Sequence, residues 1–330
     1  VLEGLMMRGS RAISLAVRCP DGSISLSVEP VNPPGKLRKV PALRGILSFA
    51  DSIATGMRML MQSADMLEEG GGSTEEQDKL FVWLESKLGK EKAEKIGMYI
   101  SVLIALIFTI GVFIVLPTLI VSMLRKTGID SALLLNLVEG LIRIVMFALY
   151  ITLVSRIPDI KRTFMYHGAE HKTIHCYENE LELNVANVQS FYTLHPRCGT
   201  SFLMFVMVIS LLLFSLLGWP SVAARVISRL ILIPLIAGLS YELLQFTGRH
   251  DNAFVRTLSM PGIMLQKLTT AEPTDEMVEL AIIALKAVLP SHEDPDLPVE
   301  YSVGMLTPDG EYTEDPEKTE AYRKKRTEGG

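Results

Sequence analysis

The segment YHGAEHKTIHCYE, residues 166–178, holds three histidines, two glutamates and a cysteine. Imidazole nitrogens, carboxylate oxygens and thiolate sulfurs are common ligands of zinc and related metals. Within it, HGAEH matches H-x-x-E-H, the inverted zincin pattern, in which two histidines bind zinc and the glutamate activates a water molecule. Bound zinc lowers the pKa of that water, and a nearby carboxylate then accepts its proton. The segment therefore predicts His167 and His171 as metal ligands and Glu170 as a general base.

A helix over residues 163–178 would bring these side chains together. Each residue of an α-helix turns by about 100°, so residues three or four positions apart share a face. One face then gathers His167, His171 and Glu178, with Glu170 and the secondary candidate His175 at its edges. Cys176 points to the opposite side, where a buried thiol is the simpler interpretation.

A second short segment offers further ligands. LHPRCGT, residues 194–200, holds His195 and Cys198 in a tight loop, and the H-x-x-C spacing lets both side chains converge on one ion. Arg197 lies between them and is a secondary candidate. Glu242 is another, because a carboxylate in an otherwise apolar stretch is costly unless it faces a partner. Solubility could also explain such polar residues, but four of the six histidines lie between positions 167 and 195, which favours a metal or catalytic site.

The elements that must position these residues are mostly apolar. Hydrophobic residues make up 48% of the 330-residue chain and concentrate between residues 98 and 247. Four stretches are long enough to cross about 30 Å of hydrocarbon: Met98–Leu124, Leu133–Ile157, Thr200–Leu217 and Val226–Phe246. The sequence therefore predicts a mainly α, polytopic helical membrane protein with about four transmembrane helices.

The flanking regions are expected to form smaller elements. Two alternating runs around PDG, residues 20–22, predict a small N-terminal β-hairpin. Amphipathic helices are predicted over residues 42–67 and, after an N-cap at Thr274, over residues 275–289. A glycine-rich linker is expected after the first of these helices. Residues 291–330 are rich in proline and charge and are expected to be disordered.

The distribution of basic residues predicts how the apolar stretches are oriented across the membrane. Lysines and arginines gather before the first apolar stretch, between the second and third, and after the fourth. Because cytoplasmic segments carry an excess of these residues, we expect a multi-pass protein of the bacterial cell membrane with both termini in the cytoplasm. The expected organisation is an N-terminal cytoplasmic region (1–97), two transmembrane helices (98–157), a cytoplasmic His/Glu/Cys-rich loop (158–199), two more transmembrane helices (200–247), cytoplasmic helices (248–290) and the tail (291–330).

Composition indicates which classes of partner the protein is expected to bind. A net charge of −5 gives no basic signal for nucleic acid. Three cysteines in different contexts argue against a disulfide framework and fit a reducing compartment. The expected partners are the lipid bilayer and, through the amphipathic helices, other membrane proteins or a second copy of the chain.

Several strings together resemble the YqhQ-like bacterial membrane proteins, a domain of unknown function: GLMMRGSRAISLAVRCPDGSI, FMYHGAEHKTIHCYE, LHPRCGTSF and MPGIMLQKLTTAEPTDEMVELAI. The resemblance covers nearly all of residues 1–290, in order. It implies a polytopic bacterial membrane protein and a metal-dependent enzyme, and it supplies no substrate. The positions that match the polar motif of the family are His167, Glu170, His171, His175, Glu178, His195, Arg197 and Cys198.

These observations favour a metal-dependent hydrolase whose site lies at the cytoplasmic membrane surface. Zinc is the expected metal, although iron or manganese also accept histidine and carboxylate ligands. Glu170 is the expected catalytic base. The expected ligands are His167, His171, His195, Cys198 and Glu178. Catalysis needs an open coordination position, whereas four protein ligands would make the site structural.

Two other functions remain open. In a transporter or channel subunit, the embedded Glu139, Arg143 and Glu242 would line a path. The i, i+4 spacing of Glu139 and Arg143 equally fits a structural salt bridge, and no inverted repeat is visible. In a non-enzymatic membrane scaffold, a structural metal would tie the polar loop to the third apolar stretch.

Overall fold

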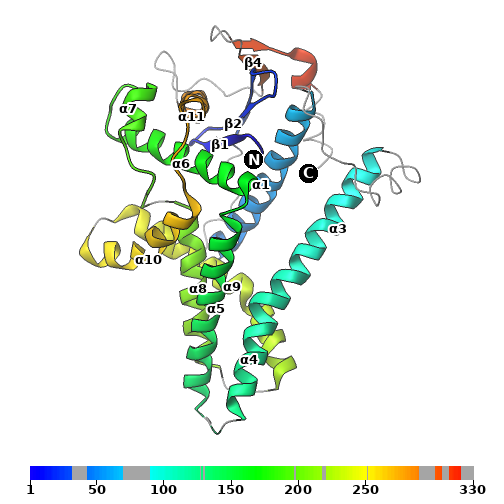
Figure 1. Ribbon diagram of the computed structural model, residues 1–330, viewed down its shortest axis with the longest axis vertical. Helices are drawn as coiled ribbons and strands as arrows, with labels where there is room; N and C mark the ends of the chain where they lie inside the picture. Colours follow the sequence, from blue (N-terminus) through cyan, green and yellow to red (C-terminus); the bar gives the residue numbers. More distant parts are fainter. Residues whose placement is uncertain are drawn as a thin grey trace.

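The computed structural model describes residues 1–31, 43–69, 90–126, 128, 131–196, 198–217, 221–250, 252–289, 302–306 and 312–320. A sheet with covering helices lies at one end of the molecule, and long apolar helices extend from it to the other end (Figure 1). Most of the expected glycine-rich linker lies outside the described residues.

Five antiparallel strands form the sheet, in the order β1-β2-β3-β4-β5. They are β1 (Gly4–Arg8), β2 (Ala12–Arg18), β3 (Ile24–Pro30), β4 (Ser302–Leu306) and β5 (Tyr312–Glu314). The predicted hairpin is confirmed, because β2 pairs with β3 from Ala12 opposite Pro30 to Arg18 opposite Ile24. Gly22 in the connecting turn has a φ of +86°, which glycine adopts without steric cost.

The expectation of a disordered tail is wrong for residues 302–306 and 312–320, which include two strands, whereas the other residues after 290 lie outside the described part of the chain. Val303 of β4 lies opposite Ser27 of β3, and Met305 of β4 lies opposite Thr313 of β5. The tail has too little apolar surface to fold alone, but the backbone groups along an open strand edge can order a polar segment by pairing with it. Composition could not reveal this pairing, because β3 lies at the other end of the sequence.

Helices cover both faces of the sheet. Residues Ile13, Leu15 and Val17 of β2 form one cluster with Met59 and Met66 of α1 (Leu43–Glu69). On the other face, Ala12 and Ala16 belong to a larger cluster with Val278, Leu280 and other residues of α11 (Asp275–Val288). Both predicted amphipathic helices are thus confirmed, and the Thr274 hydroxyl caps α11 by accepting from the Met277 N–H at 3.4 Å.

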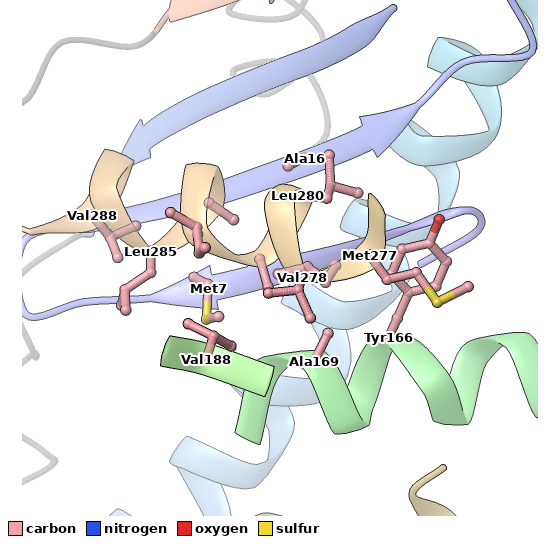
Figure 2. Packing of buried hydrophobic residues seen from close by; sticks show 14 of the residues in the cluster. Met7, Ala16, Tyr166, Ala169, Val188, Met277, Val278, Leu280, Leu285 and Val288 are labelled. Carbon is pink, nitrogen blue, oxygen red and sulfur yellow. The ribbon is translucent and has the colours of Figure 1, made fainter. Parts of the chain in front are cut away.

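The helix α6 (Pro158–Glu178) carries the polar motif and packs against α11 and β1. Figure 2 shows Tyr166 and Ala169 of α6 near Met277 and Val278 of α11, and these residues belong to one buried cluster. The predicted helix over residues 163–178 is confirmed. Its apolar side is anchored to this cluster, so its opposite side is held in a fixed direction.

The remaining helices form the apolar bundle and its connections. They are α3 (Lys90–Ile110), the π-helical turn η2 (Gly111–Val115), α4 (Leu116–Arg125), α5 (Ala132–Val154), α7 (Val185–Gln189), α8 (Thr200–Ser215), α9 (Val222–Arg249) and α10 (Ala253–Thr269). α6 begins directly after α5, and α8 follows the loop that contains His195 and Cys198.

Three helices in the described part of the chain are long and apolar enough to cross a membrane: Tyr99–Arg125, Ala132–Val154 and Val222–Arg249. The predicted third stretch, from Thr200 to Leu217, differs. Its helix α8 ends at Ser215 after 16 residues, and a rise of 1.5 Å per residue makes it about 24 Å long. This is shorter than a hydrocarbon core of about 30 Å, so length and composition support three candidate spans and one shorter apolar helix.

Candidate metal centre

The first group of possible ligands contains His167, His171 and Cys198, whose donor atoms all lie within 4.8 Å of one another. His167 and His171 lie one turn apart on α6, and their ring centroids are 4.4 Å apart. Cys198 comes from the loop before α8, and its Sγ lies 3.1 Å from Nε2 of His167. Two imidazoles and one thiol therefore face a common point from two elements.

Backbone carbonyls orient both histidines of this group. His167 Nδ1 lies 2.8 Å from the carbonyl oxygen of Thr269, and His171 Nδ1 lies 2.5 Å from that of Thr193. A carbonyl only accepts, so each Nδ1 carries the hydrogen and each Nε2 keeps its lone pair. Ligating histidines in metal sites are usually held in this way, with the second ring nitrogen donating to a carbonyl or carboxylate.

The sulfur of Cys198 is held at the start of α8. The backbone N–H of Thr200 donates to Cys198 Sγ at 3.4 Å, and the Thr200 hydroxyl lies 3.2 Å from the same sulfur. The loop thus holds the sulfur in place beside the first residue of α8.

A second group lies beside the first. It contains His175, Glu178 and His195, whose donor atoms also lie within 4.8 Å of one another. His195 Nε2 is 3.4 Å from a carboxylate oxygen of Glu178, and the rings of His175 and His195 are 4.8 Å apart. Burial lowers the pKa of His195 to about 4, against the opposing effect of the Glu178 carboxylate. The imidazole is therefore neutral at physiological pH, which is the form that binds metals.

The two loop residues do not share a group. The H-x-x-C spacing predicted that His195 and Cys198 converge on one ion, but His195 joins His175 and Glu178, whereas Cys198 joins His167 and His171. The loop runs along α6, so side chains three positions apart reach different turns of the helix.

Sequence reasoning missed Gln266 of α10, which holds the backbone of His195. Gln266 Oε1 accepts from the His195 N–H at 2.8 Å, and Gln266 Nε2 donates to the His195 carbonyl at 2.8 Å. The Gln266 side chain is fully buried. Nothing in the spacing of α10 marks this residue, because its role depends on how α10 packs against the loop.

Gly168, inside the HGAEH motif, has a structural role of its own. A Cβ at this position would lie 2.1 Å from the carbonyl oxygen of Ala271. The same segment is tied to α6 by a hydrogen bond from the Ala271 N–H to the Phe164 carbonyl at 2.9 Å. The glycine therefore lets the chain after α10 approach α6 and bring the Thr269 carbonyl to His167.

A cavity of about 520 Å³ is lined by all three residues of the first group and by Glu178 and His195 of the second. Its lining residues are His167, Glu170, His171, Ile174, Glu178, His195, Cys198, Gly199 and Thr200. Glu170 belongs to neither group of ligands. Burial raises the pKa of the Glu170 carboxyl. A carboxyl with a raised pKa, beside possible metal ligands, suits proton transfer near neutral pH.

Cys176 lies away from this site. It is fully buried in the cluster with α11, and its Sγ lies 3.5 Å from the Glu182 carbonyl oxygen. Burial raises the pKa of this thiol. The interpretation of Cys176 as a buried thiol is confirmed.

The other secondary candidates lie elsewhere. Arg197 lies outside the described residues. Glu242 of α9 forms an ion pair with Arg44 of α1, with Arg44 Nε 3.1 Å from Glu242 Oε1. These helices cross closely beside that pair, because a Cβ on Gly45 would lie 2.5 Å from the Gly238 carbonyl oxygen. The pair links the sheet layer to the bundle and is not part of either ligand group.

Glu139 and Arg143 lie in a buried ionic cluster of the bundle. Arg143 Nη2 lies 3.4 Å from Glu139 Oε1, so the predicted i, i+4 pair is confirmed. The stronger partner is Arg229 of α9, whose Nη1 and Nη2 donate to the two carboxylate oxygens, the second at 2.7 Å. The hydroxyl of Thr118 also donates to Glu139 at 2.7 Å. The carboxylate thus joins α4, α5 and α9 at a distance from the histidines.

The π-helical turn η2 provides a further contact for this cluster. Arg143 Nε donates to the Phe113 carbonyl at 2.8 Å. A π-turn shifts the backbone hydrogen-bond pattern by one residue and can leave a carbonyl for a side-chain donor. The π-helical turn therefore presents a backbone carbonyl to the Arg143 side chain.

Comparison with known proteins agrees with the sequence motifs. Residues 40–291 match the family described as "Protein of unknown function (DUF1385)". The chain is 35% identical over 300 residues to "Uncharacterized protein YqhQ" of Bacillus subtilis (strain 168), and the match covers 88% of this chain and 90% of that protein. No solved structure matches the chain significantly. The family match and this identity over most of both chains show that the protein belongs to the YqhQ-like DUF1385 family.

Proposed function

We propose that this protein is a metal-dependent hydrolase of the bacterial cell membrane, with a zinc ion held by His167, His171 and Cys198. The observation that carries the proposal is the convergence of two oriented imidazoles and one buried thiol within 4.8 Å. Glu170 on the wall of the adjoining cavity is the proposed general base.

The donor set suits this metal. Zinc accepts imidazole nitrogen and thiolate sulfur, and a thiolate disfavours the hard ions magnesium and calcium. Three protein ligands leave one position of a tetrahedral ion open, as in catalytic zinc sites, whereas structural sites use four. His195, Glu178 and His175 belong to the neighbouring group and are not needed to hold this ion.

Each residue has a role that follows from its contacts. His167 and His171 present Nε2 because the Thr269 and Thr193 carbonyls hold Nδ1–H. Glu170 would accept a proton from a water molecule in the cavity, and burial shifts its pKa toward the range useful for this at neutral pH. A bound zinc ion would supply Lewis acidity and a lower pKa for that water.

The location of the site supports action at the membrane surface. α6 begins four residues after α5 ends, and the Cys198 loop leads directly into α8. The site therefore lies where two apolar helices meet the polar layer of sheet and helices (Figure 1). With the lysine and arginine distribution of the sequence, we place this layer and both termini in the cytoplasm.

Two observations weigh against a transport path through Glu139, Arg143 and Glu242. Glu139 and Glu242 each bind an arginine from a neighbouring helix. Arg229, which binds Glu139, lies 13 residues before Glu242 on α9, which corresponds to about 20 Å along the helix. The three residues thus belong to two separate ion pairs, each of which joins helices.

Metal content tests the proposal. The full chain is purified in detergent without chelator, and metal per chain is measured by elemental mass spectrometry for wild type and for His167→Ala/His171→Ala. We expect zinc in the wild type and a loss of one equivalent in the double variant. His250→Ala is the matched control, because this exposed histidine directly after α9 donates from Nδ1 to the Phe246 carbonyl at 2.9 Å and lies outside both groups.

Activity is then tested on panels of ester, phosphoester and peptide substrates, with Glu170→Gln as the variant that keeps the ligands. Hydrolysis that needs both zinc and Glu170 supports the enzyme. A structural metal in a scaffold would instead be identified by bound zinc without any hydrolysis, together with an X-ray absorption spectrum that shows four protein ligands on the zinc.

A further inference from the structure

We propose that His175, Glu178 and His195 bind a second metal ion beside the first, so that the centre is dinuclear. The inference rests on the proposed function for the first ion and extends it. The α6 residues of the two groups occupy successive turns, and residues of both groups line one cavity, but the groups share no ligand.

The number of donors argues for two ions. The described residues bring together six donor side chains, three in each group, whereas a zinc ion in a protein takes about four ligands. A single ion at either group would leave the two imidazoles of the other group without a function. Two ions with three protein ligands each use every donor and keep open positions on both.

The helix period explains why the groups are adjacent. His167, His171 and His175 follow one another at i, i+4 along α6, and Glu178 adds one more turn. Such side chains lie one above the other on the same face. The ring of His195 is 5.6 Å from that of His171 and 4.8 Å from that of His175, so His195 borders the first group while its donor atom belongs to the second.

The second group is as firmly held as the first. His175 Nε2 lies 2.8 Å from the Leu194 carbonyl oxygen, so this nitrogen carries the hydrogen and Nδ1 keeps the lone pair. Gln266 holds the backbone of His195 through both its N–H and its carbonyl. Both histidines are buried, with 7% of His175 and 5% of His195 exposed. Ligands that are oriented before the ion arrives lose little freedom on binding.

Charge and access also favour a cation. Glu178 contributes a carboxylate that is 31% exposed and lines the cavity, so an ion can reach it from solvent. A carboxylate with two imidazoles is a ligand set found in catalytic zinc sites. Paired metal ions about 3.5–4 Å apart recur in phosphatases, nucleases and aminopeptidases, where the two ions hold the attacking and leaving groups together.

Reconstitution with zinc alone tests the second site. The full chain in detergent is stripped of metal and titrated with zinc, and bound metal per chain is measured after desalting. We expect two equivalents for the wild type and one for each of His167→Ala/His171→Ala and His175→Ala/His195→Ala. Glu178→Gln is a milder variant that keeps the side-chain shape, and we expect it to lower the affinity for the second zinc ion at least tenfold. His250→Ala is again the control, and circular dichroism with gel filtration verifies that each variant is folded.

Cobalt titration separates the two ions. The first group contains a thiol and the second does not, so only the first should produce a sulfur-to-cobalt charge-transfer band. We expect that band to persist in the His175→Ala/His195→Ala variant and to vanish in Cys198→Ala, while cobalt still binds the second group.

The outcomes distinguish this inference from the proposed function. The wild type could bind one zinc ion per chain that is lost in His167→Ala/His171→Ala and kept in Glu178→Gln. This result would overturn the second site and leave the first intact. One equivalent lost in both double variants would show a single shared ion and also overturn it. No bound zinc in the wild type would overturn both proposals.

Discussion

His167 Nε2 lies 3.1 Å from Cys198 Sγ, although 31 residues separate them in the sequence. The contact joins α6 to the loop before α8, so the chemistry of the first group depends on both elements. It also brings a thiol from a loop that contains proline and glycine together with histidines from a helix.

Replacement of Cys198 tests the sulfur ligand. Cys198→Ser exchanges a soft sulfur for a hard, weakly acidic hydroxyl. Loss of an outer-shell partner already weakens metal binding by about 10–100-fold, and loss of a ligand is expected to cost at least the upper end of that range. Competition with a chromophoric chelator measures the affinity. Cys176→Ala removes a thiol from the apolar cluster and should leave zinc affinity unchanged; an equal loss in both variants would contradict the assignment.

Gln266 can be tested as a positioning residue. Gln266→Leu leaves the N–H and carbonyl of His195 buried without these partners, and each such group costs about 1–3 kcal/mol. We expect a loss of about 2 kcal/mol or more in the free energy of unfolding, together with weaker binding at the second group. Calorimetry in detergent and zinc titration provide the two readouts.

The comparison variant for Gln266 is Gln245→Leu. Gln245 is partly buried on α9 and contacts Tyr241 and Arg249. Its loss is expected to change stability by less than about 0.5 kcal/mol. Normal zinc binding by a folded Gln266→Leu protein would show that the His195 loop holds its position without the glutamine.

Gly168 provides a steric test. Gly168→Ala places a Cβ 2.1 Å from a backbone oxygen, so α6 and the Ala271 segment must move apart. Overpacking of this kind costs about 1–3 kcal/mol, and the shift also removes the Thr269 carbonyl from His167. Gly56→Ala is the matched control, because its added Cβ meets no atom within 4 Å beyond the adjacent residues and backbone of its own helix and alanine is preferred to glycine in helices by up to about 1 kcal/mol. We therefore expect thermal midpoints that move in opposite directions.

The low pKa of His195 predicts a pH dependence of stability in the metal-free protein. The folded pKa is about 4 and the ordinary value is 6.5, so the unfolded chain binds a proton that the folded chain does not. Above the pKa of the unfolded chain, His195 therefore makes no pH-dependent contribution to the free energy of unfolding. As the pH falls from about 6.5 to 4, His195 increasingly destabilises the folded protein. Chemical unfolding of wild type and His195→Gln across this range measures the difference. A constant difference between the two proteins would show that His195 titrates normally.

Glu139 tests the buried ionic cluster. Only 1% of its side chain is exposed, and Glu139→Gln leaves Arg229 and Arg143 beside a neutral amide. Removal of one partner from a buried ion pair costs about 3–5 kcal/mol. Glu242→Gln breaks a partly exposed pair and is expected to cost less than about 1 kcal/mol. Thermal unfolding in detergent distinguishes the two, and equal midpoints would contradict the central role of Glu139.

Local sequence patterns were sufficient to predict several elements of this protein. The turn at residues 20–22, the capped helix after Thr274 and the ligand face of residues 163–178 all follow from interactions between residues close in sequence. The helical period alone predicts that His167, His171 and Glu178 share a face, because that period does not depend on the rest of the fold.

Only the tertiary structure decided how the ligands are grouped. The H-x-x-C spacing is compatible with one ion, but the path of the loop along α6 sends His195 to one group and Cys198 to the other. That path depends on Gln266 of α10 and on the close approach at Gly168. Likewise, the order in β4 depends on an edge of β3 from the other end of the chain. Contacts between distant segments leave no periodic signal, so the composition and spacing of either segment alone could not predict them.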